Sequence, residues 1–204
     1  MSDLLHYHKN LNKLTKFDNY YIFVINKHQM KIVRIIANIL FYVSKVLSIF
    51  YLIITVYAST VLLLYRYSSI SELPVNVDKD GFEIFYPFTK TPFLLGDYDK
   101  NYLLSMLLFT TGYAVFLWLL ADVFNAFRQQ KLFIKKGVLQ LSRFYIFNLC
   151  VPLLILIFFA ITGLALNEIF VRTFLHVVIG IFAFFMAAIF KQGLVLQEEQ
   201  DLTL

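Results

Sequence analysis

Two long apolar runs without a charged residue constrain the fold of this chain more than any other feature. They are Tyr102–Ala121 and Phe144–Leu166, and each is long enough to cross the roughly 30 Å hydrocarbon core of a bilayer as a helix. The stretch Phe124–Arg143, which lies between them, contains five basic residues and no acidic one: Arg128, Lys131, Lys135, Lys136 and Arg143. We therefore predict a helix, a basic loop and a second helix, with the loop in the cytoplasm, because basic loops are retained on that side.

Two further apolar runs complete a four-span arrangement. Val46–Leu64 is a charge-free run of 19 residues, and Thr173–Phe190 is the fourth run. The chain is 60% hydrophobic, whereas soluble domains are about 45–50% apolar, so the excess indicates contact with lipid. We expect an all-α integral membrane protein, a bundle of four transmembrane helices. Its membrane domain covers residues 31–204 and follows a cytoplasmic N-terminal extension at residues 1–30.

The distribution of charge predicts the orientation of the spans. Residues 1–45 carry seven basic and two acidic residues, while residues 66–100 carry four basic and six acidic ones. We expect the loop at 66–100 outside, and the loop at 122–143, the tail at 191–204 and both termini inside. Within this scheme we expect Gly137 to separate two short helical pieces of the inner loop, and Asn167–Arg172 to form a tight outer turn.

The outer loop contains a pattern typical of a β-hairpin. Val75–Val77 and Phe82–Tyr86 read as strands, and the Asp80-Gly81 pair between them suits the positive φ angles of a tight turn. A further short strand is compatible with Phe93–Leu95. An isolated hairpin is marginally stable in water. We therefore predict a small extracytoplasmic hairpin between the first two spans, with its aromatic residues resting on the membrane surface or on the helices.

Several function classes are disfavoured by what the sequence contains. The net charge of +5 sits beside membrane spans, which argues against nucleic-acid binding. The single cysteine, Cys150, lies in an apolar run and is expected to be a core thiol. His6 and His8 flank Tyr7 without an evident third ligand, so we predict no metal site. The apolar run at the N-terminus, Tyr20–Ile25, is too short for a cleavable signal peptide.

The middles of the predicted spans lack the groups that transport and catalysis use. Asp, Glu, Lys, Arg and His are missing around Thr55, Gly112, Ile155 and Ile181, although ion-coupled transporters place ionisable groups at depth. The sequence has no catalytic or phosphate-binding motif, so we expect neither an enzyme nor a cofactor. Small residues at span positions are predicted to let helices approach closely: Gly112, Ala114, Gly163, Ala165, Gly180, Ala183, Ala187 and Ala188.

Three sets of residues are candidate interaction sites. The C-terminal tail combines acidic groups with leucine anchors that suit a basic cytoplasmic partner. The residues concerned are Gln197, Glu198, Glu199, Asp201, Leu202 and Leu204. The alternative for the same residues is a helix end followed by a disordered tail. The five basic loop residues suit lipid headgroups or a partner, although their role in topology alone explains them. Glu168, Arg172 and His176 follow helical i, i+4, i+8 spacing and suit an outer ion pair with a pH-sensitive histidine.

Two stretches resemble one known family. The first is Asp122–Phe133, DVFNAFRQQKLF, with Leu141-Ser-Arg at the entry to the third span; the second is Phe190–Leu204, FKQGLVLQEEQDLTL. Together they are similar to the exit helix, basic turn, re-entry and acidic Asp-Leu-Thr ending of the domain-of-unknown-function 2975 family of small four-helix bacterial membrane proteins. The chain departs from that pattern at Gln129-Gln130 and at Gln200, and residues 1–29 lie outside the likeness.

The resemblance implies a location and a partner. It implies an integral protein of the bacterial cytoplasmic membrane without an established enzymatic activity, and many family members look to be encoded beside a small helix-turn-helix regulator. We therefore expect a regulatory or sensory protein that engages such a regulator through its tail and basic loop, with homo-oligomerisation left open. The alternative is a small transport or immunity component that acts through the helix bundle.

Overall fold

The computed structural model describes the backbone of residues 2–68, 70, 72–79, 81–163 and 167–202, and side chains in these ranges except at 2–27, 167 and 168. Four helices dominate it: α1 (Ser2–Tyr67), α2 (Lys100–Phe127), α3 (Lys135–Thr162) and α4 (Asn167–Leu202). All four contain segments long and apolar enough to cross a membrane, which is the build of an integral membrane protein.

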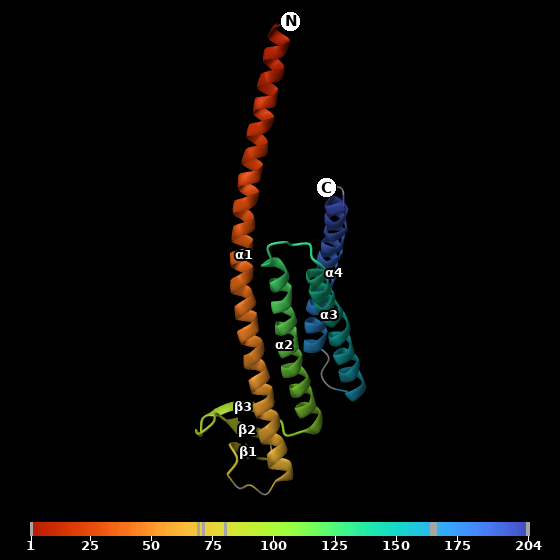
Figure 1. Cartoon of the computed structure of the whole chain (residues 1–204). Coiled ribbons are helices and arrows are strands. Elements are labelled where there is room, and N and C mark those ends of the chain that lie inside the picture. Colours follow the sequence, from red (N-terminus) through yellow and green to blue (C-terminus); the bar gives the residue numbers. More distant parts are fainter. Residues whose placement is uncertain (1, 69, 71, 80, 164–166, 203–204) are drawn as a thin grey trace.

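The four helices pack as two antiparallel pairs that meet through α2 and α3. α1 lies along α2 and α3 lies along α4, while α2 and α3 share a smaller contact. Figure 1 shows the α3–α4 pair on the side of α2 away from α1, and it shows α1 reaching far beyond the other helices. α1 begins and α4 ends at the end of the molecule that holds the α2–α3 loop, which we call the basic end. The opposite end, beside the strands, is the sheet end.

Helix α1 turns its apolar stripe outward and its polar residues inward between Ile32 and Ser48. Ile35 and Ile39 are exposed, whereas Arg34 makes a hydrogen bond to the α2–α3 loop. Farther along, the buried Ser48 hydroxyl donates to the carbonyl of Ala114 on α2, at 2.8 Å. This arrangement is the reverse of a soluble amphipathic helix and suits a helix whose outer face meets lipid. α1 also runs without a break through the boundary that we predicted at residues 30 and 31.

A three-stranded antiparallel sheet lies between α1 and α2 in the chain. Its strands are β1 (Val75–Val77), β2 (Phe82–Phe85) and β3 (Pro92–Gly96), in the order β1-β2-β3. The buried side chains of Phe82 and Ile84 on β2 pack against buried Ala58, Val61 and Leu62 of α1. The Tyr57 hydroxyl also donates to the carbonyl of Phe85, at 2.7 Å. The sheet is therefore stabilised by the end of α1, while Asp80 of the predicted turn lies outside the described residues.

The loops at the basic end are shorter than the sequence predicted. The predicted inner loop, 122–143, is helical except for residues 128–134, and the predicted tail is helical to Leu202. Gly137 lies inside the first turn of α3 rather than between two helical pieces. It is buried, and a β-carbon there would make ordinary van der Waals contacts with Ala126 and Phe190, at 3.5 Å. The predicted turn at Asn167–Arg172 is also wrong, because α4 already begins at Asn167.

The small residues of the spans have different roles, and not all of them are helix contacts. Gly180 is one, because a β-carbon there would stand 2.8 Å from Leu149 on α3. By contrast, a β-carbon at Gly112 would meet nothing within 4 Å, and Gly163 ends α3 with a left-handed φ of 70°. Cys150 is exposed on α3, so its prediction as a core thiol is wrong. The end of the third span at Leu166, and Ala165, lie outside the described residues.

Buried aromatic packing joins the helices at the basic end. Phe190 of α4 is only 3% exposed, and its ring meets those of Phe127 and Phe133 edge to face, with centroids 5.2 and 5.5 Å apart. A β-carbon at Gly193 would stand 2.6 Å from the Phe133 ring, so α4 can approach the loop only through a glycine. This cluster links α2, the loop, α3 and α4, and it positions the residues of the candidate site.

Candidate functional site

A groove at the basic end combines side chains from three helices. Its volume is about 440 Å³, which is within the range of roughly 300–1,000 Å³ for ligand sites. α1 and α3 supply two of its walls, and the end of α2 with the following loop lies between them. We call it the basic groove, and its lining residues are Phe41, Lys45, Asp122, Asn125, Arg128, Gln129, Lys136, Leu139, Gln140 and Arg143.

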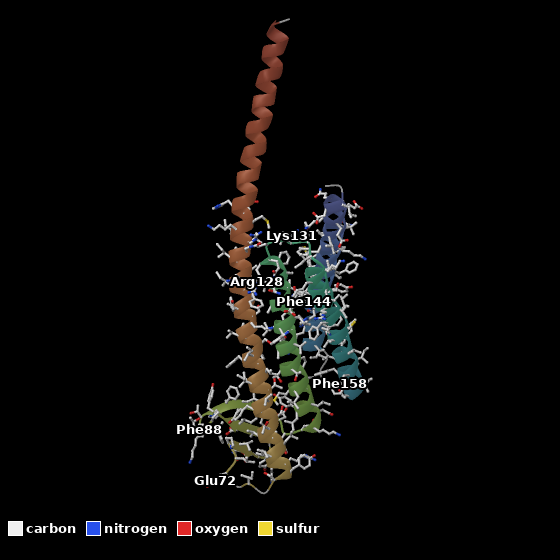
Figure 2. The ribbon with its side chains drawn as sticks, viewed as in Figure 1. Glu72, Phe88, Arg128, Lys131, Phe144 and Phe158 are labelled. Carbon is white, nitrogen blue, oxygen red and sulfur yellow. The ribbon has the colours of Figure 1, made fainter. Side chains whose placement is uncertain are left out.

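Arg128 occupies the centre of this site and is held by α1 and α2 together. Its Nε donates to Asn125 Oδ1 at 2.8 Å, and its Nη1 donates to Asn38 Oδ1 at 3.3 Å. Its guanidinium carbon also lies 4.0 Å from the centroid of the Phe41 ring, which is a cation–π contact. Figure 2 labels Arg128 beside α1 and α2. The guanidinium is therefore fixed in orientation, and it retains donors beyond these two hydrogen bonds.

A second cleft, of about 960 Å³, adjoins the basic groove and shares Arg128 and Gln129 with it. Arg34 reaches into this cleft from α1 and donates from Nη2 to the carbonyl of Gln130, at 2.8 Å. Its Nε is buried and has no hydrogen-bond partner among the described residues. Buried donors of this kind are normally satisfied, so Arg34 keeps unused capacity to bind an acceptor.

Lys45 marks the inner limit of the basic groove. Its Nζ lies 2.8 Å from the centroid of the Trp118 ring on α2, which is close enough for a strong cation–π contact. The groove contains one acidic residue, Asp122, against four basic ones. Its charge is therefore positive, and its floor is partly aromatic.

The five basic residues predicted for the loop divide into two groups. Arg128, Lys136 and Arg143 line the basic groove. Lys135 instead points to the C-terminal part of α4, where its Nζ lies 3.4 Å from Glu198 Oε1 in an exposed ion pair. Lys131 is exposed in the loop, and Figure 2 labels it at the basic end, near the loop. Only the first group therefore belongs to one site.

The predicted docking residues of the tail are part of α4. Glu198, Glu199 and Asp201 are exposed on its last turns, and Leu202 is 86% exposed. Gln197 is half-buried in the same helix, and Leu204 lies outside the described residues. The alternative of a disordered tail is therefore wrong up to Leu202, because these residues continue α4.

A small cavity of about 40 Å³ lies between α2, α3 and α4, nearer to the sheet end. Gly112, Arg172, Thr173 and His176 contribute to its lining. His176 is half-buried, and its Nδ1 lies 2.7 Å from Oδ1 of the fully buried Asn148 on α3. The side chain of Glu168 lies outside the described residues, so the ion pair with Arg172 and His176 stays a prediction. An ionisable group therefore lies beside Gly112, at a depth where the sequence predicted none.

We expect the Asn148–His176 hydrogen bond to stabilise the α3–α4 pair modestly. Asn148 Nδ2 donates to the carbonyl of Phe144 at 2.8 Å, so its Oδ1 accepts from His176 Nδ1. A double-mutant cycle of Asn148→Ala and His176→Ala, read by unfolding in mixed detergent, should give a coupling of about 0.5–1.5 kcal/mol. A coupling of zero would show that the two side chains act independently.

The amide side chains around Arg128, in the basic groove and the adjoining cleft, were not predicted as site residues from the sequence. Asn38, Asn125, Gln129 and Gln140 gather around Arg128, and Asn125 and Gln140 are buried. Gln129 Nε2 donates to the Asn125 carbonyl at 3.1 Å. The sequence feature that could have indicated them is an amide within an otherwise apolar helix, since Asn and Gln commonly make hydrogen bonds between membrane helices. Together with the guanidinium, these groups can bind a small anion.

Comparison with protein-family models, with curated proteins and with solved structures found no match to this chain.

Proposed function

We propose that this chain is a non-enzymatic protein of the bacterial cytoplasmic membrane with a regulatory or sensory role. In this proposal the basic end, with both termini, faces the cytoplasm, and the sheet lies outside. The final turns of α4 and the basic loop bind a small helix-turn-helix regulator and hold it at the membrane. The resemblance to the domain-of-unknown-function 2975 family supports this assignment of the partner.

One observation carries the proposal. α4 continues as a helix to Leu202 and exposes Glu198, Glu199 and Asp201 there. Leu196, 61% exposed, and Leu202 lie in the same segment. Acidic groups beside exposed leucines form a surface that complements a basic, DNA-binding partner in both charge and hydrophobicity. The helix also positions this surface rigidly, because Phe190 and Gly193 fix it against the loop.

The test is co-purification from the native host with the helix-turn-helix regulator encoded beside the gene. We expect deletion of residues 197–204 to reduce recovery of the regulator by about five-fold or more, since it removes the charged and apolar anchors together. Deletion of residues 2–27 is the control and should leave recovery unchanged. Equal recovery with the intact chain and with the tail deletion would contradict the proposal.

The cavity favours a second candidate, a small transport or immunity component that acts through the bundle. Arg172, Thr173 and His176 bring polar groups to it, and Gly112 leaves space on its α2 side. Under this alternative, Gly112→Leu should abolish the function by filling the cavity, whereas the tail deletion should have no effect. The regulatory proposal predicts the opposite pair of results.

A further inference from the structure

We infer that the basic groove binds the phosphate of an anionic phospholipid from the adjacent membrane leaflet. This site is separate from the acidic surface of α4, and the inference does not depend on the proposed regulator. It requires three properties of the groove: donors that suit a phosphate, a position at the depth of the headgroups, and an apolar path for an acyl chain.

The donors come from different helices and converge on one volume. Arg128 is held between Asn38 and Asn125, and Lys136 and Arg143 project from α3 into the same groove. Arginine and lysine together bind phosphate well, because the guanidinium offers a planar pair of donors and the ammonium adds a point charge. Asp122 offsets one of these charges, so the lining keeps a positive excess.

The depth of the groove follows from the outer surface of α1. Exposed isoleucines continue along α1 as far as Ile32, beside the second cleft. The stretch from Ile32 to Leu64 would span about 50 Å at 1.5 Å per residue, which exceeds the hydrocarbon core and includes a headgroup layer. Lys45, which directly precedes the charge-free run Val46–Leu64, thus lies at the level of the headgroups on a helix whose outer face is apolar, and Arg34 lies about 16 Å farther toward the basic end. A phosphate at this level needs only lateral diffusion to enter the groove.

The apolar path lies beside the charged lining. Phe41 and Leu139 border the groove from α1 and α3, and Trp118 is 46% exposed beneath Lys45. An acyl chain can therefore extend along this surface while the phosphate contacts Arg128. A free inorganic phosphate would use the charged donors but gain nothing from the apolar surface, and this difference separates the two sources of the ligand.

The test uses the full-length protein in detergent, with phosphatidylglycerol and phosphatidylethanolamine as probes and native mass spectrometry as the readout. We expect Lys136→Gln with Arg143→Gln to weaken phosphatidylglycerol binding by about ten-fold, since each basic group near an anionic headgroup contributes substantially. Lys131→Gln with Lys135→Gln removes the same charge from two neighbouring positions at the basic end that do not line the groove. This control pair should change binding less than about two-fold, and phosphatidylethanolamine should bind more weakly to every form.

Two results would overturn the inference. One is an equal loss in both double variants, which would indicate general attraction to a basic surface. The other is displacement of the lipid by millimolar inorganic phosphate as readily as by soluble lipid. A photo-crosslinking phosphatidylglycerol on the unmodified protein covers the case in which the groove variant fails to fold. Its crosslinks should map to Phe41 or to residues 136–143, and crosslinks confined to other segments would contradict the site.

Discussion

Replacing Phe190 by alanine should destabilise the protein by about 3 kcal/mol, toward the lower end of the range for truncating buried phenylalanines. The lower end applies because lipid, rather than water, surrounds the helices. The side chain then stabilises the fold through packing contacts and not through removal of apolar surface from water. Phe190 is 3% exposed and contacts Phe127 and Phe133. The variant leaves a cavity where α2, the loop, α3 and α4 meet. The measurement is the unfolding free energy of the purified chain in mixed detergent.

Phe185→Ala is the matched control for this variant. Phe185 lies on the same helix and is 57% exposed, so its removal opens no cavity between helices. We expect its effect to stay below about 1 kcal/mol. An equal loss of unfolding free energy in the two variants would show that the cluster of Phe127, Phe133 and Phe190 does not hold the helices together.

Replacing Ile84 by alanine should open the sheet while the helices remain folded. Ile84 is fully buried, at 0% exposure, between β2 and the end of α1. Truncation of such a residue costs about 2–5 kcal/mol, and strands of three to five residues have little stability of their own. Hydrogen exchange should therefore speed up at residues 75–96 and stay slow in the membrane-spanning segments of the helices.

Leu95→Ala serves as the control within the same sheet. Leu95 is 60% exposed on β3, so its truncation removes little packing. We expect exchange in residues 75–96 to match that of the unmodified chain. Fast exchange in both variants would mean that the sheet does not depend on its contact with α1.

The spans could be predicted from the sequence because their signal does not depend on how each helix is rotated. Runs such as Tyr102–Ala121 are apolar on every side, and lipid requires internal hydrogen bonding of the backbone, so a helix follows. The position of the basic loop follows from the same runs. Its length could not be predicted, because the apolar run ends before the helix does, and packing of Phe127 continues α2 to its end.

Which residues share a site depends on how each helix is rotated about its axis and on which helices pack together, and a single sequence does not contain this information. His176 was predicted on an outer surface, yet the rotation of α4 about its axis places the imidazole against Asn148 on α3. Lys135 and Lys136 are neighbours in sequence, but one meets Glu198 and the other lines the basic groove. The rotation of α3 alone decides this division. Spacing along the chain could therefore suggest which residues carry charge, but not which of them share a site.

The central claim is that the basic end faces the cytoplasm and the sheet faces outward, and labelling of single cysteines in intact cells tests it most directly. Cys150→Ser provides the background. Lys90→Cys, at an exposed position between β2 and β3, and Lys131→Cys, at an exposed position in the α2–α3 loop, provide the two reporters. We expect a membrane-impermeant maleimide to label Lys90→Cys in intact cells and Lys131→Cys only after permeabilisation. Labelling of Lys131→Cys in intact cells, with protection of Lys90→Cys, would contradict the account.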